Sequence, residues 1–190
     1  MKDNSWNGRE RNLLFVNLGD GKFSDAARPM GCDEVEESRG VAIADLDRDG
    51  RLDIVMANND AEPTIYMNRL PETGNWCRFQ LEGLVGESSP TSNRDGLGTR
   101  VTAIVKGPDG KRRIMSEAIA GGGYAAQSEG GVHFGMGKDG VLVGLEVQWP
   151  SGTKVTLGED QLKGVSNSIW KLTERGSDSD EKTLEPIDSP

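Results

Sequence analysis

The stretch DLDRDGRLD, residues 45–53, decides how the first part of this chain folds. Its aspartates fall at relative positions 1, 3, 5 and 9, and Gly50 stands at position 6. In a loop that curls around an ion, every second side chain points inward, so carboxylate oxygens converge, and Gly50 permits the sharp reversal. Calcium prefers such flexible all-oxygen sites. The stretch therefore predicts a calcium (Ca²⁺) site with five ligand residues: the carboxylates of Asp45, Asp47, Asp49 and Asp53 and the backbone carbonyl of Arg51.

The residues that flank this loop favour strands. Residues 41–44 and 54–57 are rich in Val, Ile and Ala, and Met56 occupies position 12, where an EF-hand needs a bidentate Glu. The loop is therefore expected to join the two strands of a hairpin. The alternative is an acidic turn without metal, in which carboxylates roughly 5 Å apart would repel by about 3 kcal/mol per pair at an effective dielectric of about 20. Magnesium fits less well, because it keeps several waters and takes few protein ligands.

Outward from the loop, short strand-like runs alternate with turn residues, and the chain holds 26 Gly. Helical periodicity is limited to the short stretch 160–165, so the predicted fold class is all-β. The expected strands are 13–17, 41–44, 54–57, 64–68, 77–81, 100–106, 112–120, 131–135, 141–149, 154–157 and 168–172. Four consecutive strands, from 41–44 to 77–81, are expected to form one group.

Composition divides the chain into four parts. Residues 12–82 contain the metal loop, and residues 99–173 form a second β domain. Residues 83–98 are rich in Gly, Ser, Pro and Asn and indicate an inter-domain connection. Residues 174–190 hold six acidic and two basic side chains, which predicts a disordered acidic tail.

The net charge of −9 and the lack of an apolar span exclude two classes of function. A strongly acidic chain without a basic cluster repels phosphate, so no nucleic-acid partner is expected. No stretch reaches the roughly 20 apolar residues of a membrane helix, so no transmembrane segment is expected. Cys32 and Cys77 allow either one disulfide or two free buried thiols, and the free thiols are favoured.

Two parts of the sequence resemble known families. Residues 40–58, with the loop at their centre, resemble an FG-GAP/VCBS repeat of integrin-like β-propellers, and residues 12–23 resemble the closing strands of a preceding repeat. The second half is similar to the ASPIC/UnbV domain. Its motifs are NRDGLGTRV (93–101), GGGYAAQS (121–128), VHFGMG (132–137) and LEVQWPSG (145–152).

The resemblance implies a partial β-propeller, with calcium in a surface loop of one four-stranded blade, followed by a small β-sandwich or barrel. A propeller needs about 4–8 blades to close, and this chain offers one full repeat and part of another. Either it is part of a longer chain, which we favour, or the blade folds together with the second domain. The family is mostly secreted or surface-associated, so an exported, extracellular location is expected, although residues 1–5 lack the apolar region of a signal peptide.

Sharper chemical interpretations rest on few residues. Ser128 lies in AAQSEG, near a Gly-x-Ser-x-Gly pattern, but no helix follows, and His133 is the chain's one His. A loop Ser bonded to backbone and a hydrogen-bonded structural His are favoured over a catalytic pair. Trp149 and Trp76 could form a carbohydrate platform, but core packing is the favoured role.

The sequence therefore predicts a non-catalytic, calcium-stabilised extracellular adhesion or assembly module with a protein or glycan surface partner. A carbohydrate-binding module and an accessory domain of a surface enzyme are the two alternatives. The resemblance attaches no firm activity to the second domain, and no catalytic residue is assigned.

Overall fold

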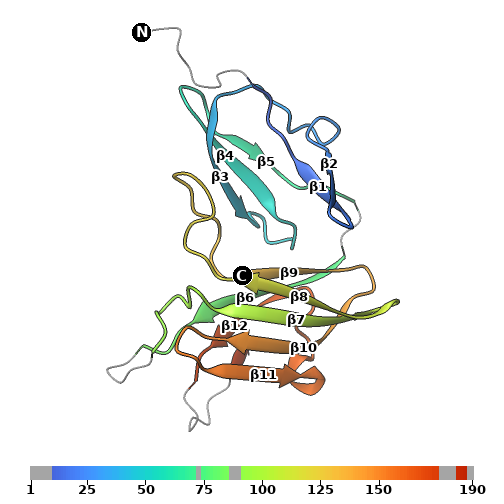
Figure 1. Ribbon diagram of the computed structural model, residues 1–190, viewed down its shortest axis with the longest axis vertical. Coiled ribbons are helices and arrows are strands. Elements are labelled where there is room, and N and C mark those ends of the chain that lie inside the picture. Colours follow the sequence, from blue (N-terminus) through green and yellow to red (C-terminus); the bar gives the residue numbers. More distant parts are fainter. Residues whose placement is uncertain (1–9, 72–73, 86–90, 176–182, 188–190) are drawn as a thin grey trace. The chain divides into compact units, whose positions relative to one another are not determined.

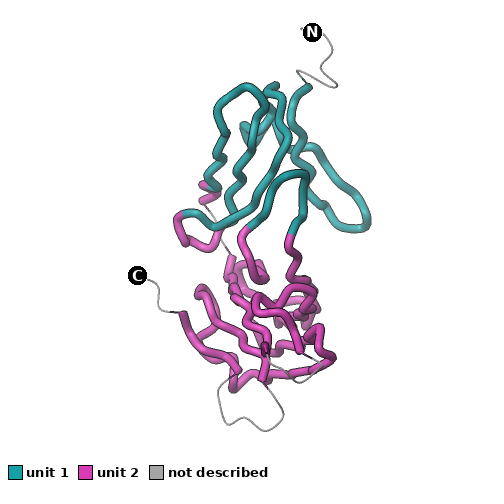
Figure 2. Tube along the Cα trace, turned by 90° about the vertical axis from the view of Figure 1, so that its left-hand side faces the viewer, with its two compact units in different colours: residues 1–46, 52–68, 121–128 teal, residues 47–51, 69–120, 129–190 magenta. Residues whose placement is uncertain are grey.

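The computed structural model describes residues 10–71, 74–85, 91–175 and 183–187. The described chain is all-β, as predicted, and it forms two compact units (Figure 2). The first unit contains residues up to 46, residues 52–68 and residues 121–128. The second contains residues 47–51, residues 69–120 and the chain from residue 129 onward.

The first unit holds a hairpin and a three-stranded antiparallel sheet. Strands β1 (Phe15–Gly19) and β2 (Lys22–Asp25) form the hairpin, with a tight turn at Asp20 and Gly21 between them. The sheet has the order β3-β4-β5, and all its pairs are antiparallel (Figure 1). Its strands are β3 (Ser38–Ala44), β4 (Asp53–Asn58) and β5 (Thr64–Tyr66).

The predicted group of four strands is wrong in its last member. Residues 77–81 lie in β6 (Asn75–Glu82), which pairs with strands of the second unit and not with β5. The physical reason is burial, because Cys77 and Phe79 are fully enclosed in the core of the second unit. The strands that bury these two apolar side chains are distant in sequence, so the local sequence pattern could not reveal the pairing of β6.

The free edge of β3 is covered by residues 121–128, which lie in the same unit. The backbone N–H of Ile43 donates to Ser128 Oγ at 3.1 Å. A Cβ added to Gly40 would stand 3.2 Å from the Tyr124 carbonyl oxygen and 3.5 Å from the Ala126 Cβ. An edge strand with unpaired backbone groups favours unwanted pairing, so this segment protects β3.

The second unit is a sandwich of two four-stranded sheets. One has the order β11-β10-β7-β8 (Figure 1), and the other has the order β13-β12-β6-β9. Strand alternation places one side of each sheet in the shared apolar core, which includes Phe134, Leu145 and Trp149. The predicted small β-sandwich is thereby confirmed. The remaining strands are β7 (Arg100–Gly107), β8 (Gly110–Glu117), β9 (Val132–Gly137), β10 (Val141–Gln148), β11 (Lys154–Gly158), β12 (Ser168–Thr173) and β13 (Leu184–Pro186).

One pair in this sandwich is parallel. Strand β12 runs alongside β6 in the same direction, from the pair Ser168 and Cys77 to the pair Thr173 and Glu82. The two strands form the centre of their sheet, between β13 and β9. The first strand of the unit, β6, is therefore hydrogen-bonded to β12, which lies near the end of the chain.

Residues 83–98 connect β6 to β7, so they link the two sheets of one sandwich. The interpretation of this segment as an inter-domain connection is wrong. Near its start, the N–H of Leu84 donates to the buried carboxylate of Glu174 at 2.9 Å, and the Ser151 hydroxyl bonds the same group. Burial alone would raise the pKa of Glu174, but these donors outweigh it, and the pKa is lowered. The carboxylate thus anchors the connection to the end of β12.

The acidic tail is ordered in part. Residues 184–186 form β13, which pairs antiparallel with β12, so the prediction of disorder is wrong for them. The rest of that prediction, for residues 176–182 and 188–190, lies outside the described residues. The short helical stretch predicted near residue 160 is a 3-10 helix, Glu159–Leu162.

Candidate metal centre

The aspartate-rich stretch connects β3 to β4 as the loop of an antiparallel hairpin, and Ala44 and Asp53 form the last strand pair. The predicted hairpin is therefore confirmed. Arg48 and Gly50 adopt positive φ of 61° and 86°, so the chain reverses within a few residues. Gly is well suited to such a conformation because it lacks a Cβ.

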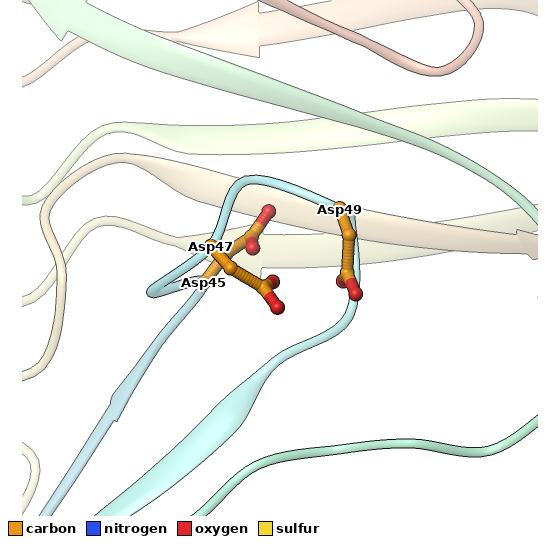
Figure 3. A group of neighbouring side chains, drawn as sticks. All are labelled: Asp45, Asp47 and Asp49. Atoms are coloured by element: carbon orange, nitrogen blue, oxygen red, sulfur yellow. The ribbon is translucent and has the colours of Figure 1, made fainter.

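Three carboxylates converge inside this loop (Figure 3). Asp45, Asp47 and Asp49 each offer one oxygen, and these oxygens all lie within 4.8 Å of one another. Asp45 is only 5% exposed. Oxygens about 2.3–2.6 Å from a shared calcium would be separated by such distances. The first three predicted side-chain ligands are therefore together.

The fourth predicted side-chain ligand has another role in the loop. Asp53 is 1% exposed, and its two carboxylate oxygens accept backbone N–H groups, from Leu46 at 2.9 Å and from Asn68 at 2.8 Å. Asp53 thus closes the base of the loop and fixes the chain after β5. It stands outside the group of three, so its part as a ligand and that of the Arg51 carbonyl stay predictions.

Two arginines compensate the negative charge of the loop. The Arg51 guanidinium pairs with Asp49, and Arg69 Nη1 lies 2.8 Å from Asp47 Oδ2. Sequence reasoning missed Arg69, because no local pattern links it to a loop that ends 16 residues earlier. A divalent cation would compete with both guanidinium groups for the same oxygens.

The tip of the loop packs against an aromatic pair of the second unit, to which residues 47–51 also belong. A Cβ added to Gly50 would stand only 1.9 Å from Trp76 Nε1. The Gly50 carbonyl oxygen lies 3.1 Å from His133 Nε2, and the rings of Trp76 and His133 stack with centroids 5.8 Å apart. Glycine is therefore required at position 50 for two reasons: the backbone has a positive φ, and the Trp76 indole leaves no room for a Cβ.

Backbone contacts occupy two of the residues that were considered for catalysis. Ser128 Oγ accepts the Ile43 N–H and His133 Nε2 lies 3.1 Å from the Gly50 carbonyl oxygen, so both make a backbone contact of the kind that the structural interpretation predicts. Trp149 is 1% exposed and lies in the sandwich core. A carbohydrate platform on Trp149 is therefore wrong. Trp76 is half-buried against the loop.

Both cysteines are free thiols, which agrees with the favoured alternative. Cys77 is fully buried, and burial raises its pKa to about 12. Cys32 is half-buried, and burial followed by the charges of Glu34 and Asp33 raises its pKa. A raised pKa keeps a thiol protonated at neutral pH, which disfavours the thiolate that acts as a nucleophile.

Replacing Ser128 by Ala tests the structural role of this hydroxyl. The Ile43 N–H would lose its protein acceptor, and we expect the free energy of unfolding to fall by about 0.5–1 kcal/mol. Urea denaturation followed by circular dichroism measures the change. A Ser116→Ala variant in β8 is the matched control. Loss of a hydrolytic activity in Ser128→Ala without loss of stability would contradict the structural assignment.

Comparison with known families agrees with the sequence motifs. Residues 3–56 match the model of the FG-GAP-like repeat, and residues 89–178 match the model named ASPIC and UnbV. The first match contains the aspartate loop, and the second contains strands β7 to β12. The family models therefore find an FG-GAP-like repeat followed by an ASPIC/UnbV domain in this chain.

Curated relatives share a short segment with this chain. Cartilage acidic protein 1 of Xenopus tropicalis is 54% identical over 57 residues, and its counterpart in Homo sapiens is 47% identical over a segment of the same length. The segment covers 30% of this chain and 9% of each relative. Within the described residues, no helix is long and apolar enough to cross a membrane.

Proposed function

We propose that this chain is a non-catalytic, calcium-stabilised module for adhesion or assembly outside the cell. The observation that carries the proposal is the convergence of three carboxylate oxygens within 4.8 Å in the loop of an FG-GAP-like repeat. A module of this kind acts through its surface, and the ion serves to hold that surface in one conformation. Its partner is a protein or glycan surface.

The donor set fits calcium. All candidate ligand atoms are oxygens, which hard cations prefer, and calcium accepts the irregular coordination geometry that a short loop offers. Asp45, Asp47 and Asp49 would hold the ion, and Asp53 and the Arg51 carbonyl would complete the set. A bound cation would stabilise the loop by replacing the mutual repulsion of these carboxylates with attraction.

The hairpin explains how binding would reach the rest of the repeat. Asp53 joins the base of the loop to Asn68, which follows β5, so the position of the loop is coupled to three strands. An ion that orders residues 45–51 would therefore stabilise the whole β3-β4-β5 sheet. Extracellular calcium modules often bind at about 10⁻⁴–10⁻³ M, a range that suits the exterior of a cell.

A non-catalytic role is supported by the partners of the polar groups that sequence reasoning considered for chemistry. Ser128 bonds the backbone of β3, His133 contacts the backbone of the metal loop, and Cys77 is sealed in the core. These contacts and this burial would compete with a role of the three side chains as nucleophile or base. The family match adds an FG-GAP-like repeat, which suits an interaction module.

Terbium luminescence tests the site directly, because terbium replaces calcium in oxygen sites and is excited by energy transfer from a nearby indole. The contact between Trp76 and Gly50 puts a donor beside the loop. We expect sensitised emission that calcium displaces and that millimolar magnesium displaces poorly. A Trp76→Phe variant should lose most of the emission while it keeps calcium affinity by calorimetry. Emission that calcium does not displace, or that survives Asp45→Asn together with Asp47→Asn, would overturn the proposal.

A further inference from the structure

The sheet β11-β10-β7-β8 carries a charge opposite to that of the whole chain. Its four strands hold six basic and two acidic side chains, a net charge of +4, whereas the chain has −9. All other residues together therefore carry −13. The basic residues are Arg100, Lys106, Lys111, Arg112, Arg113 and Lys154, and the acidic ones are Glu117 and Glu146.

Most of these cations point away from the core. Val101, Ala103 and Val105 of β7 are fully buried, so alternation places Arg100 and Lys106 on the outer face. Strand pairing puts Glu117 opposite Arg100 and Lys111 opposite Lys106 on that face. The face extends over about 20 Å from Arg100 to Lys106, at roughly 3.3 Å per residue.

Three lysines on this outer face take no part in an ion pair among the described residues. Arg113 donates to both oxygens of Glu146, at 2.8 and 2.6 Å, and Arg100 pairs with Glu117 at 2.9 Å. No ion pair to Lys106, Lys111 or Lys154 occurs among the described residues, and all three are exposed. Lys106 and Lys111 also stand directly opposite each other, an arrangement that destabilises a sheet unless an anion lies between them.

A shallow groove of about 360 Å³ crosses the same face. Arg100, Arg113 and Lys154 contribute cationic groups to it, and Thr102, Gln148 and Thr156 contribute neutral hydrogen-bonding groups. Glu146, whose carboxylate is bound by Arg113, and the side chain of Met115 also line the groove. The four strands contain no Phe, Tyr or Trp. Neutral sugars and unpaired bases are commonly recognised by stacking on such rings, so this face lacks the means to hold them.

We propose that the outer face of the β11-β10-β7-β8 sheet binds a linear sulfated polysaccharide. Such a chain presents regularly spaced anions with hydroxyl groups between them, which matches separated cations and intervening Thr and Gln side chains. An acidic peptide would find a groove lined mostly by charged and polar side chains, whereas peptide sites commonly use apolar pockets for specificity. The surplus of −13 elsewhere would orient a polyanion toward this one surface.

This inference deepens the proposed function, because it names a partner class, and it rests on that proposal for the extracellular location. The two remain separable by experiment. The face shares no residue with the aspartate loop, so binding to it should be the same in calcium and in EDTA if the sandwich stays folded. Failure of the metal site would therefore leave the polysaccharide result intact.

Heparin is the probe, with binding measured by calorimetry at physiological salt on the full chain. We expect the double variant Lys106→Gln and Lys111→Gln to bind about tenfold more weakly, since each exposed contact contributes modestly. The matched control, Lys22→Gln and Lys163→Gln, removes the same charge elsewhere and should stay within about twofold. The first variant should melt no lower than the parent, because an opposed like-charge pair is removed.

Binding to other polyanions shows whether the face prefers a sulfated polysaccharide. Affinity for heparin should fall as salt rises and should exceed affinity for hyaluronan, poly-glutamate and vesicles containing phosphatidylserine. Equal losses in the two double variants would show a non-specific charge effect and would overturn the proposal. Tighter binding to poly-glutamate or to the vesicles than to heparin would also overturn it, as would no heparin binding by the parent.

Discussion

In a few millimolar calcium, the protein should melt about 2–8 °C higher than it does in EDTA. With a dissociation constant of about 10⁻⁴–10⁻³ M, this calcium concentration is about 3–30 times the constant, and an ion that binds only the folded state then adds about 0.8–2 kcal/mol. Each kcal/mol shifts the melting temperature by about 2–4 °C in a domain of this size. Differential scanning fluorimetry with magnesium as the control ion measures the shift, which magnesium should reproduce only in small part.

The variant Asp47→Ala makes this result specific to the loop. It removes one of the three converging oxygens and an exposed pair with Arg69, and exposed pairs contribute little. We therefore expect it to lower the melting temperature in calcium and to leave it nearly unchanged in EDTA. Asp139→Ala, at an exposed turn, should change neither. Equal destabilisation of Asp47→Ala in both buffers would show that the aspartate has a structural role independent of calcium.

Replacing Gly50 by Ala should lower the free energy of unfolding by about 2–5 kcal/mol. The positive φ of Gly50 makes any Cβ unfavourable, and the new methyl would collide with the Trp76 indole. The loop tip would have to move, so terbium emission should fall as well. Urea denaturation followed by tryptophan fluorescence measures the stability.

Gly21→Ala separates the two causes of this effect. Gly21 has a similar positive φ of 71°, but no atom lies within 4 Å of an added Cβ. Its substitution should therefore cost only the conformational part, about 1 kcal/mol. If both variants lose the same stability, the contact between Gly50 and Trp76 contributes nothing, and the packing account of the loop is wrong.

Local signals in the sequence were sufficient for most strands and for the hairpin loop. Strands β7 and β8 were predicted at residues 100–106 and 112–120, and pairing across the short turn between them needs no distant information. The aspartate loop was predicted because its ligand spacing lies within nine residues. Convergence of Asp45, Asp47 and Asp49 follows from the same short stretch of backbone.

The features that sequence reasoning missed all depend on distant partners. Residues 77–81 were grouped with β5 because they come next, whereas their pairing is decided by β12 and β9. Residues 121–128 were recognised as a motif, but nothing local indicates that they cover β3. The ion pair between Arg69 and Asp47 was also missed, because the chain brings Arg69 back to the aspartate loop only after β4 and β5.

The parallel pairing of β6 and β12 imposes an order on biosynthesis. The paired residues Cys77 and Ser168 are 91 positions apart, so at about 5–20 residues per second β6 leaves the ribosome several seconds before its central partner exists. During that interval its apolar side chains and one backbone edge lack their final neighbours. A nascent chain interrupted before residue 168 would keep this strand exposed, and such a fragment should be bound by chaperones instead of accumulating in a folded form.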